Sequence, residues 1–231
     1  MNSGSGRPSA VELPDSGMSG MWTHTRVAEL IDPPEGGPVV DVGTGTGAFS
    51  DWLLDHGYAV TAVGVDPAQY RGRAPFLQHD ADTGLPFDSG TLEGIVAIEL
   101  IEHLEAPYRF VREAARCLHH GGWLAVTTPN TISLSSKVSL AFRNYPIYFG
   151  PDDFARNGHI SPISLIDLRR IASRTGLSVQ VVTYNIGRLP IPRLRHWLPL
   201  KHRLFRNQHW GESLVAVLRK TSDPSDRFER G

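Results

Sequence analysis

The chain has 231 residues, 40% of them hydrophobic and 20% charged, with a formal net charge of −1 at pH 7. This length suits one α/β domain with insertions or two small domains, and the net charge by itself indicates no partner. The single Cys117 excludes a disulfide framework and a cysteine-rich zinc site. No apolar run reaches membrane-spanning length, and residues 1–10 lack the hydrophobic region of a signal peptide, so a cytoplasmic location is expected.

The first 20 residues are rich in Ser, Gly and Pro, and we expect a disordered arm followed by a helix over residues 22–31. From Val39 onward, short apolar stretches alternate with helical patterns. Strands are expected over residues 39–42, 59–65, 76–80, 94–99, 123–128, 177–184 and 212–220. Helices are expected over residues 48–57, from Pro107 to about Leu118, and from Ser161-Pro162 to Gly176. The alternation predicts an α/β fold, a Rossmann-like doubly wound seven-stranded and mostly parallel sheet with helices on both faces.

Two segments interrupt this alternation. Residues 131–158 form a long, aromatic-rich insertion after the fifth strand, and residues 188–210 separate the last two strands. Insertions at the carboxyl ends of strands border the ligand crevice of such sheets, so both are candidate substrate elements. Surface decoration is the alternative for the first.

The stretch VVDVGTGTG (39–47) is a strand that runs into a glycine-rich turn at the start of a helix. Gly43, Gly45 and Gly47 would let the backbone approach a ligand closely, and the helix N-terminus offers free amide groups. Asp66, at the end of the next strand, is placed to accept hydrogen bonds from a ribose diol. A turn of this kind also satisfies the nucleotide-binding pattern of dehydrogenases, so the turn alone does not decide between them.

The stretch ELIEHLEAP (99–107) places Glu99, Glu102 and His103 at positions i, i+3 and i+4, which share one face of a helix. Such a group is a metal site, a general-base cluster or the polar cap of a helix. The spacing leaves these three readings open.

Several motifs in order resemble the class I S-adenosylmethionine-dependent methyltransferases over roughly residues 35–220. They are Asp41 before the glycine turn, HDAD (79–82), ELIEHLEAP and LHHGGWLAVTTPN (118–130). The resemblance implies a methyltransferase domain over residues 21–220, followed by a tail (221–231). It also implies that S-adenosyl-L-methionine is the cofactor. Its methionine end would be lined by Asp41, Gly43, Thr44, Gly45 and Gly47. Asp66 would hold the ribose, and Asp80 with Ala81 the adenine.

One departure from that family concerns residues 66–75, where a full helix is usual. The stretch DPAQYRGRAP is too short for a helical crossover, which normally needs a dozen or more residues. We therefore expect an irregular connection, with Pro67 and Arg71 shaping that end of the pocket.

The E-x-x-E-H run, TTPN and the later GHISPIS resemble two branches of the family in particular. These are the ubiquinone-pathway O-methyltransferases and the small-RNA 3′-terminal 2′-O-methyltransferases. The resemblance implies a divalent metal (Mg²⁺, Mn²⁺ or Zn²⁺) that grips two neighbouring hydroxyls, with Glu99, Glu102, His103 and His159 as ligands. Direct acid–base use of His103 or His159, and a purely structural role, are the alternatives. Glu102, His103 and His159 are accordingly the candidate catalytic residues.

The resulting prediction is O-methylation of a small-molecule, sugar or lipid-linked hydroxyl, with Tyr145, Tyr148 and Phe149 lining the acceptor pocket. An RNA 2′-O-methyltransferase, an NAD-dependent oxidoreductase and a non-catalytic cofactor-binding protein are the alternatives.

The basic segment 188–210 lies in a stretch without acidic residues between Asp167 and Glu212. It predicts peripheral contact with the inner face of an anionic membrane, and it also suits nucleic acid. Solvated arginines, with the apolar residues packed on the sheet edge, are the plainer alternative.

Overall fold

The structure is a computed structural model that describes residues 22–185, 187–190, 197–200 and 206–222, with the backbone alone for 187–190 and 197–200. The expected disordered arm (1–20) lies outside these ranges, as does the tail (221–231) apart from its first two residues. Among the described residues, none of the helices combines the length and the apolar character needed to cross a membrane.

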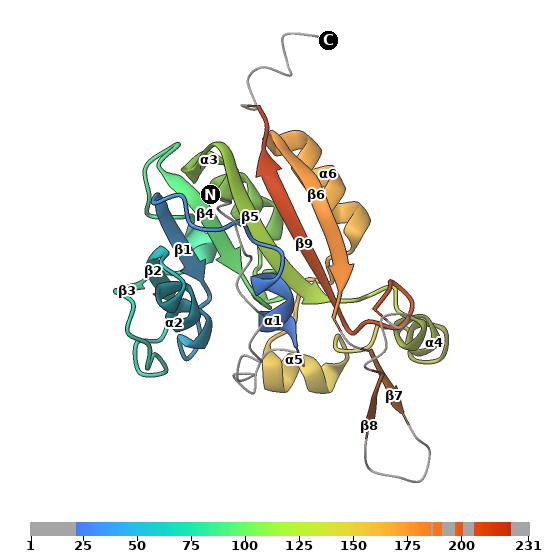
Figure 1. Cartoon of the computed structure of the whole chain (residues 1–231). Coiled ribbons are helices and arrows are strands. Elements are labelled where there is room, and N and C mark those ends of the chain that lie inside the picture. The colour runs from blue at the N-terminus through green and yellow to red at the C-terminus, as the bar shows by residue number, and fades with distance from the viewer. Residues whose placement is uncertain (1–21, 186, 191–196, 201–205, 223–231) are drawn as a thin grey trace, which may run out of the picture.

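Seven strands form one sheet in the order β3-β2-β1-β4-β5-β9-β6 (Figure 1). Their bounds are β1 Pro38–Val42, β2 Ala59–Gly64, β3 Phe76–Gln78, β4 Leu92–Ala97, β5 Leu118–Pro129, β6 Leu177–Tyr184 and β9 Ser213–Lys220. All neighbouring pairs are parallel except those of β9, which runs antiparallel to β5 and β6. This topology confirms the predicted doubly wound, mostly parallel sheet.

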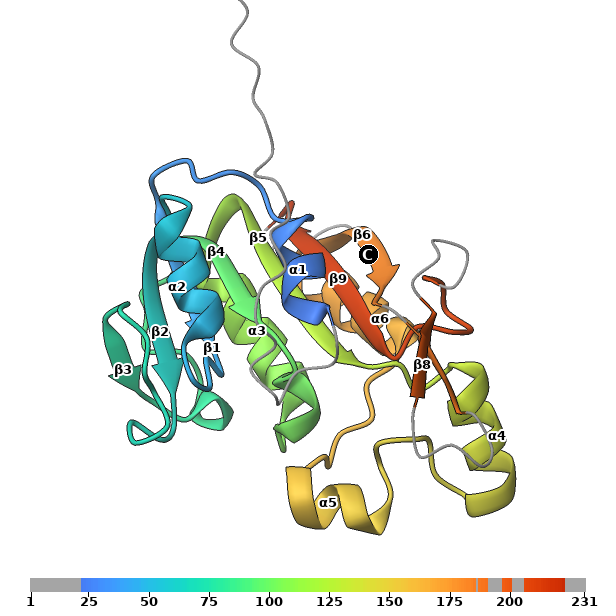
Figure 2. The same cartoon turned by 60° about the horizontal axis from the view of Figure 1, so that its bottom comes forward.

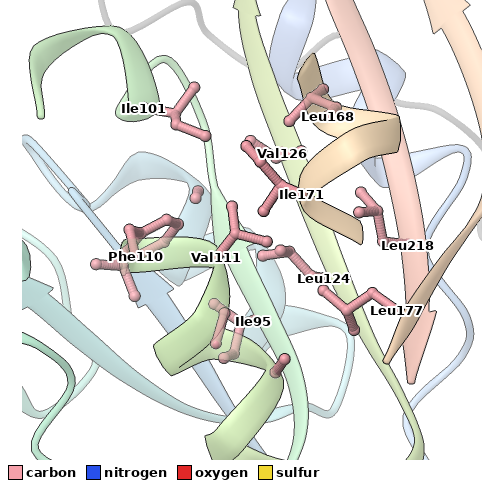
Figure 3. Close-up of a cluster of buried hydrophobic side chains, with 14 of the residues drawn as sticks. Ile95, Ile101, Phe110, Val111, Leu124, Val126, Leu168, Ile171, Leu177 and Leu218 are labelled. Carbon is pink, nitrogen blue, oxygen red and sulfur yellow. The ribbon is translucent and has the colours of Figure 1, made fainter. Parts of the chain in front are cut away.

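Helices cover both faces of the sheet. α3 (Pro107–Cys117) and α6 (Leu165–Thr175) bury Phe110, Val111, Leu168 and Ile171 against β4, β5 and β9 (Figure 3). On the other face, α1 (Thr23–Ala28) and α2 (Ala48–Asp55) bury their apolar side chains together with those of β1, β5 and β9. Burying one such large side chain contributes about 1.5–3 kcal/mol, so the two clusters hold both helical layers on the sheet.

The helix predicted from Ser161-Pro162 begins three residues later, and this correction has a clear cause. Ser164 is the N-cap of α6, and its backbone N–H donates to Asp167 Oδ2 at 3.1 Å in a capping box. Ser161 instead donates its backbone N–H to the carbonyl of Glu102 and its hydroxyl to the carbonyl of Leu104. Ser161 is therefore held by the segment that contains Glu102 and Leu104, and the helix begins after it.

The connection between β2 and β3 contains no helix, as predicted for residues 66–75. Its Arg71 N–H donates to the carbonyl of Thr46 at 3.0 Å, and the Tyr70 hydroxyl donates to the carbonyl of Ala74 at 2.7 Å. The connection is thus tied to the glycine turn rather than to a crossover helix.

The two insertions lie at one end of the sheet (Figures 1 and 2). The first contains α4 (Leu134–Arg143) and α5 (Pro151–Asn157). The second contains β7 (Gly187–Pro190) and β8 (Trp197–Leu200), which pair as an antiparallel ribbon. Most side chains of the basic segment lie outside the described residues, so its predicted membrane contact stays a prediction.

Candidate active site

A cavity of about 720 Å³ opens at the carboxyl ends of β1, β2, β4 and β5, where the ligand crevice of such a sheet is expected. The loops after these strands supply most of its wall, and the rest comes from α1, β3, the first insertion with the residues just after it, and the start of β9. The lining residues include Asp41, Gly43, Thr44, Gly45, Asp66, Phe76, Glu99, Leu100, His103, Tyr148, Arg156, Asn157 and His159.

Two glycines of the turn serve different purposes. Gly45 (φ 54°) faces open space, because a Cβ built there meets no atom within 4 Å, so the backbone is accessible to a ligand. Gly47 (φ 90°) is absent from the cavity wall, and a Cβ there would lie 2.5 Å from Tyr70 and 2.9 Å from the backbone of Gly72. Gly47 is therefore required by close packing of the β2–β3 connection, rather than by direct access to the cavity.

Asp41 lines the cavity from the end of β1 and is almost fully buried. Its Oδ2 accepts hydrogen bonds from the hydroxyls of Ser50 at 2.6 Å and Thr44 at 3.0 Å. Burial raises the pKa of Asp41 to about 6, although these two hydrogen bonds act in the opposite direction. The pair of hydroxyls fixes the carboxylate at the mouth of the glycine turn.

Asp66 lines the cavity and is exposed, and its Oδ1 accepts the Ala68 N–H at 2.9 Å. Asp80 instead caps a short 3-10 helix, η1 (Ala81–Thr83), by accepting the Asp82 N–H. Ala81 is buried, and neither Asp80 nor Ala81 belongs to the cavity wall. The predicted adenine contacts at these two residues stay predictions.

Glu99 enters the cavity wall with a left-handed backbone, φ 48°, which is uncommon for a non-glycine residue. Its N–H donates to Thr127 Oγ1 at 2.8 Å, and the same hydroxyl donates to Glu99 Oε1 at 3.0 Å. Burial raises the pKa of Glu99 to about 7, and the negative charge of Glu212 adds to this effect. The carboxylate of Glu99 is thus held by β5.

Of the four predicted metal ligands, Glu102, His103 and His159 come together, whereas Glu99 does not join them. One ligand atom from each lies within 4.8 Å of the others, and among the described residues Glu99 is not part of this group. Glu102 is fully buried, and neither of its carboxylate oxygens has a hydrogen-bond partner in the described part of the chain. Burial, and then the charge of Glu99, raise the pKa of Glu102 well above its ordinary value, and the nearby Thr128 hydroxyl opposes this with a smaller effect although its geometry does not form a hydrogen bond.

The two histidines contact each other and are held by different neighbours. Their rings meet edge to face, with centroids 4.8 Å apart. His159 Nδ1 lies 2.8 Å from the carbonyl oxygen of Tyr148. When the ring proton is on Nδ1 and donates to this carbonyl, the electron pair of Nε2 is free. Burial, and then the neighbouring His159, lower the pKa of His103, which favours its neutral form.

The backbone of Glu102 fixes how the two parts of this cluster meet. The short 3-10 helix η2 (Ile101–His103) follows β4, and the carbonyl of Glu102 accepts the N–H groups of Ile160 and Ser161, each at 2.9 Å. These bonds place the segment after α5 directly beside η2. This backbone pairing therefore brings His159 next to Glu102.

The three predicted acceptor-side aromatics occupy different places. Tyr148 lines the cavity, with φ 70°. The Phe149 ring lies 5.6 Å from that of His159 between centroids. Tyr145 packs at the start of α5, where a Cβ on Gly150 would lie 2.7 Å from its ring, and it is absent from the cavity wall.

Sequence reasoning missed many residues of the cavity wall, among them His24, Phe76, Leu100, Arg156, Asn157, Glu212 and Ser213. His24 and Arg156 lie on α1 and α5, so no strand-end motif marks them. Ser213 begins β9, and Glu212 precedes it, at the strand start predicted for residue 212. The antiparallel direction of β9, which places its start beside the end of β5, was the missing signal.

Together, the doubly wound sheet, the glycine turn, the buried Asp41 and the acid after β2 define a Rossmann-like nucleoside-cofactor-binding domain. A family model described as a methyltransferase domain matches residues 22–182. The chain belongs to this family, the class I S-adenosylmethionine-dependent methyltransferases. Family membership decides against the nicotinamide-dependent alternative.

Two relatives illustrate the similarity in sequence. A "Probable S-adenosylmethionine-dependent methyltransferase" of Mycobacterium tuberculosis is 33% identical over 131 residues, which cover 53% of this chain and 48% of the relative. The chain thus spans about half the length of that relative. The ubiquinone biosynthesis O-methyltransferase of Chromobacterium violaceum is 25% identical over 175 residues, covering 69% of this chain and 72% of the relative.

Solved structures share the fold at lower identity. A methyltransferase of Archaeoglobus fulgidus superposes with a TM-score of 0.61 and 17% identity, over 81% of this chain and 88% of that one. A methyltransferase of Mesorhizobium loti gives a TM-score of 0.61 and 14% identity, over 84% of this chain and 95% of that one. At these identities the likeness establishes the fold alone.

Proposed function

We propose that the protein transfers the methyl group of S-adenosyl-L-methionine to a hydroxyl oxygen of an acceptor that carries two neighbouring hydroxyls. The acceptor is a small molecule, a sugar or a lipid-linked compound, and a divalent ion at Glu102, His103 and His159 assists the reaction. The observation that carries this proposal is the buried Glu102 carboxylate, without a hydrogen-bond partner among the described residues, beside two imidazoles.

The wall of the cavity suits the donor. S-adenosyl-L-methionine supplies a methyl carbon bonded to a positively charged sulfur, together with an ammonium group and a ribose diol. Asp41 and Asp66 provide carboxylates for such groups, and the open space over Gly45 admits the ligand against the backbone.

The cluster of three side chains suits a divalent ion. Ligand atoms about 2.1 Å from an ion are at most ~4.2 Å apart, so the separation of up to 4.8 Å closes with a small side-chain adjustment. A metal-bound histidine normally donates its other ring N–H to a carbonyl or carboxylate, as His159 is placed to do to Tyr148. A divalent ion there would lower the pKa of a bound acceptor hydroxyl. Mg²⁺, Mn²⁺ and Zn²⁺ all accept a carboxylate with two imidazoles.

Proton transfer from the acceptor hydroxyl is the second requirement of the reaction. As the acceptor oxygen bonds to the methyl carbon and the carbon–sulfur bond breaks, the hydroxyl proton must pass to a base. Without an ion, His103 is suited to accept that proton, because it lines the cavity and its lowered pKa keeps the imidazole neutral near pH 7. With an ion bound, His103 would be a ligand instead, and the acceptor hydroxyl, acidified by the ion, would release its proton to water.

Calorimetry tests the proposal directly. Mg²⁺, Mn²⁺ and Zn²⁺ are titrated into chelator-stripped protein saturated with S-adenosylhomocysteine. We expect one-to-one binding of at least one ion, lost in Glu102→Gln and His159→Asn. Glu113→Gln, the same acid-to-amide change at a side chain paired with Arg116 on α3, is the matched control.

Methyl transfer is then compared between catechol and phenol as acceptors. Preference for catechol that disappears with a chelator would support the diol and the ion together. Equal rates on both acceptors in chelator, with no ion binding, would contradict the metal-assisted part of the proposal and leave His103 as base.

A further inference from the structure

Helix α4 presents apolar side chains to solvent. Leu134, Val138 and Phe142 recur every fourth residue and so share one face, and Phe142 is 85% exposed. Ser136 is the helix's single buried residue. A helix normally turns such a face toward the core, so an uncovered stripe marks a contact surface.

The charged residues of α4 and of the loops that flank it in sequence all have one sign. Lys137 lies within α4 and Arg143 ends it, while residues 131–150 contain no Asp or Glu. Acidic residues first appear at Asp152 and Asp153 in α5, which bound the positive region. We use the name α4 surface for Leu134, Lys137, Val138, Phe142 and Arg143.

The end of the acid-free stretch between Asp167 and Glu212 lies against the same helix. The N–H of Leu134 donates to the carbonyl of His209 at 2.8 Å, and Asn130 Nδ2 donates to the carbonyl of Gln208 at 2.9 Å. The β7–β8 ribbon and α4 occupy the same end of the sheet in both views (Figures 1 and 2). The described residues that follow the ribbon, 206–209, are therefore brought against the start of α4.

We propose that the α4 surface docks the protein on an anionic lipid bilayer. An apolar stripe flanked only by cations matches acyl chains below negatively charged headgroups, whereas a protein partner or a second copy would not require one sign of charge. The chain runs from α4 through Tyr148 to Arg156, and both residues line the cavity. Docking therefore brings the wall of the cavity close to the membrane.

Vesicle flotation tests this inference on the full chain. Vesicles of phosphatidylcholine alone are compared with phosphatidylcholine mixed with phosphatidylglycerol. We expect binding to the mixed vesicles only, weakened by salt. Each basic residue contributes roughly five-fold in affinity at an anionic surface, so the double variant Lys137→Glu, Arg143→Glu should weaken binding by at least ~25-fold. Phe142→Ser should weaken it by about ten-fold or more.

Exposed residues away from α4 provide the controls. Arg174→Glu in the last turn of α6 repeats the charge reversal, and Leu77→Ser on the edge strand β3 repeats the apolar-to-polar change. Both should bind vesicles as the wild type does. Circular dichroism and binding of S-adenosylhomocysteine verify that every variant is folded.

Three outcomes would overturn the inference. These are no binding to mixed vesicles, binding that Phe142→Ser leaves unchanged, and self-association that Phe142→Ser abolishes without vesicle binding, which assigns the surface to a second copy. The inference does not rest on the proposed methyl transfer. Its failure leaves the metal titration and the acceptor assay unaffected, so the two can fail separately.

Discussion

The Nδ1 atom of His159 lies 2.8 Å from the carbonyl oxygen of Tyr148, and this contact orients the imidazole toward Glu102 and His103. The roles of the two ring nitrogens can be tested separately, because the side-chain amides of Asn and Gln each mimic one of them. The side-chain nitrogen of Asn can occupy the place of Nδ1, whereas the longer Gln reaches the place of Nε2. The two variants therefore separate the orienting atom from the proposed ligand atom.

We expect His159→Asn to unfold near the wild-type temperature yet to lose metal binding. The loss should exceed the roughly 10–100-fold that removing an outer hydrogen-bond partner costs. His159→Gln should retain part of the affinity. Calorimetric metal titration and thermal unfolding provide the two readouts, and equal metal affinity in His159→Asn and the wild type would remove His159 from the ligand set.

Gly45 and Gly47 should respond differently to alanine. In Gly45→Ala the new Cβ meets no protein atom, so the stability cost is about 1 kcal/mol from the left-handed backbone. It does project into the space where the cofactor is expected, and affinity for S-adenosylhomocysteine should fall. In Gly47→Ala the Cβ meets Tyr70 and the Gly72 backbone, adding about 1–3 kcal/mol of destabilisation.

Urea unfolding and calorimetric titration of S-adenosylhomocysteine measure these two effects. If Gly45→Ala binds the ligand normally, the open space over the turn is not the cofactor site. If Gly47→Ala is as stable as the wild type, the contact between the turn and the β2–β3 connection is not required for packing.

The buried Asp41 predicts a specific pH dependence of stability. Its pKa is about 6 in the folded state and near 3.8 in the unfolded state, so the folded protein binds the proton more tightly. The contribution of Asp41 to stability is therefore largest below pH 4 and is lost as the pH rises to about 6, by up to ~3 kcal/mol. Asp41→Asn should remove this part of the dependence. Unfolding free energies of both proteins between pH 4 and pH 7 provide the measurement, and parallel curves would contradict it.

Variants of Asp66 and Asp80 compare two expectations for the cofactor site, one from the observed cavity and one from the family resemblance. Because Asp66 lines the cavity and Asp80 does not, Asp66→Ala should lower affinity for S-adenosylhomocysteine by about ten-fold or more, the cost of a hydrogen bond to a charged group. Asp80→Ala should mainly remove the cap of η1, at about 1 kcal/mol of stability. A comparable loss of ligand affinity in Asp80→Ala would show instead that the bound adenine reaches Asp80, as the resemblance implies.

The amino-acid sequence by itself determined the chain order of the seven sheet strands and of the helices α1, α2, α3 and α6, together with the glycine turn, Asp66 after the second strand and the irregular link before the third. It did not indicate α4, α5 or the β7–β8 ribbon inside the two insertions. These features are local, because apolar periodicity and glycine placement act within a few residues. The start of α6 was misplaced for a complementary reason. Ser161-Pro162 has the local signature of a helix start, but the backbone and hydroxyl of Ser161 are engaged by Glu102 and Leu104.

Only the tertiary structure decided which of the candidate side chains form one cluster. Glu99 and Glu102 share a face in a helical reading of ELIEHLEAP, yet Thr127 of β5 holds Glu99 in a left-handed conformation, while Glu102 turns toward the two histidines. His159 joins them because backbone bonds from Ile160 and Ser161 reach the carbonyl of Glu102. These contacts connect segments distant in sequence, and no local pattern records them, so the fold was needed to choose which acid faces the imidazoles.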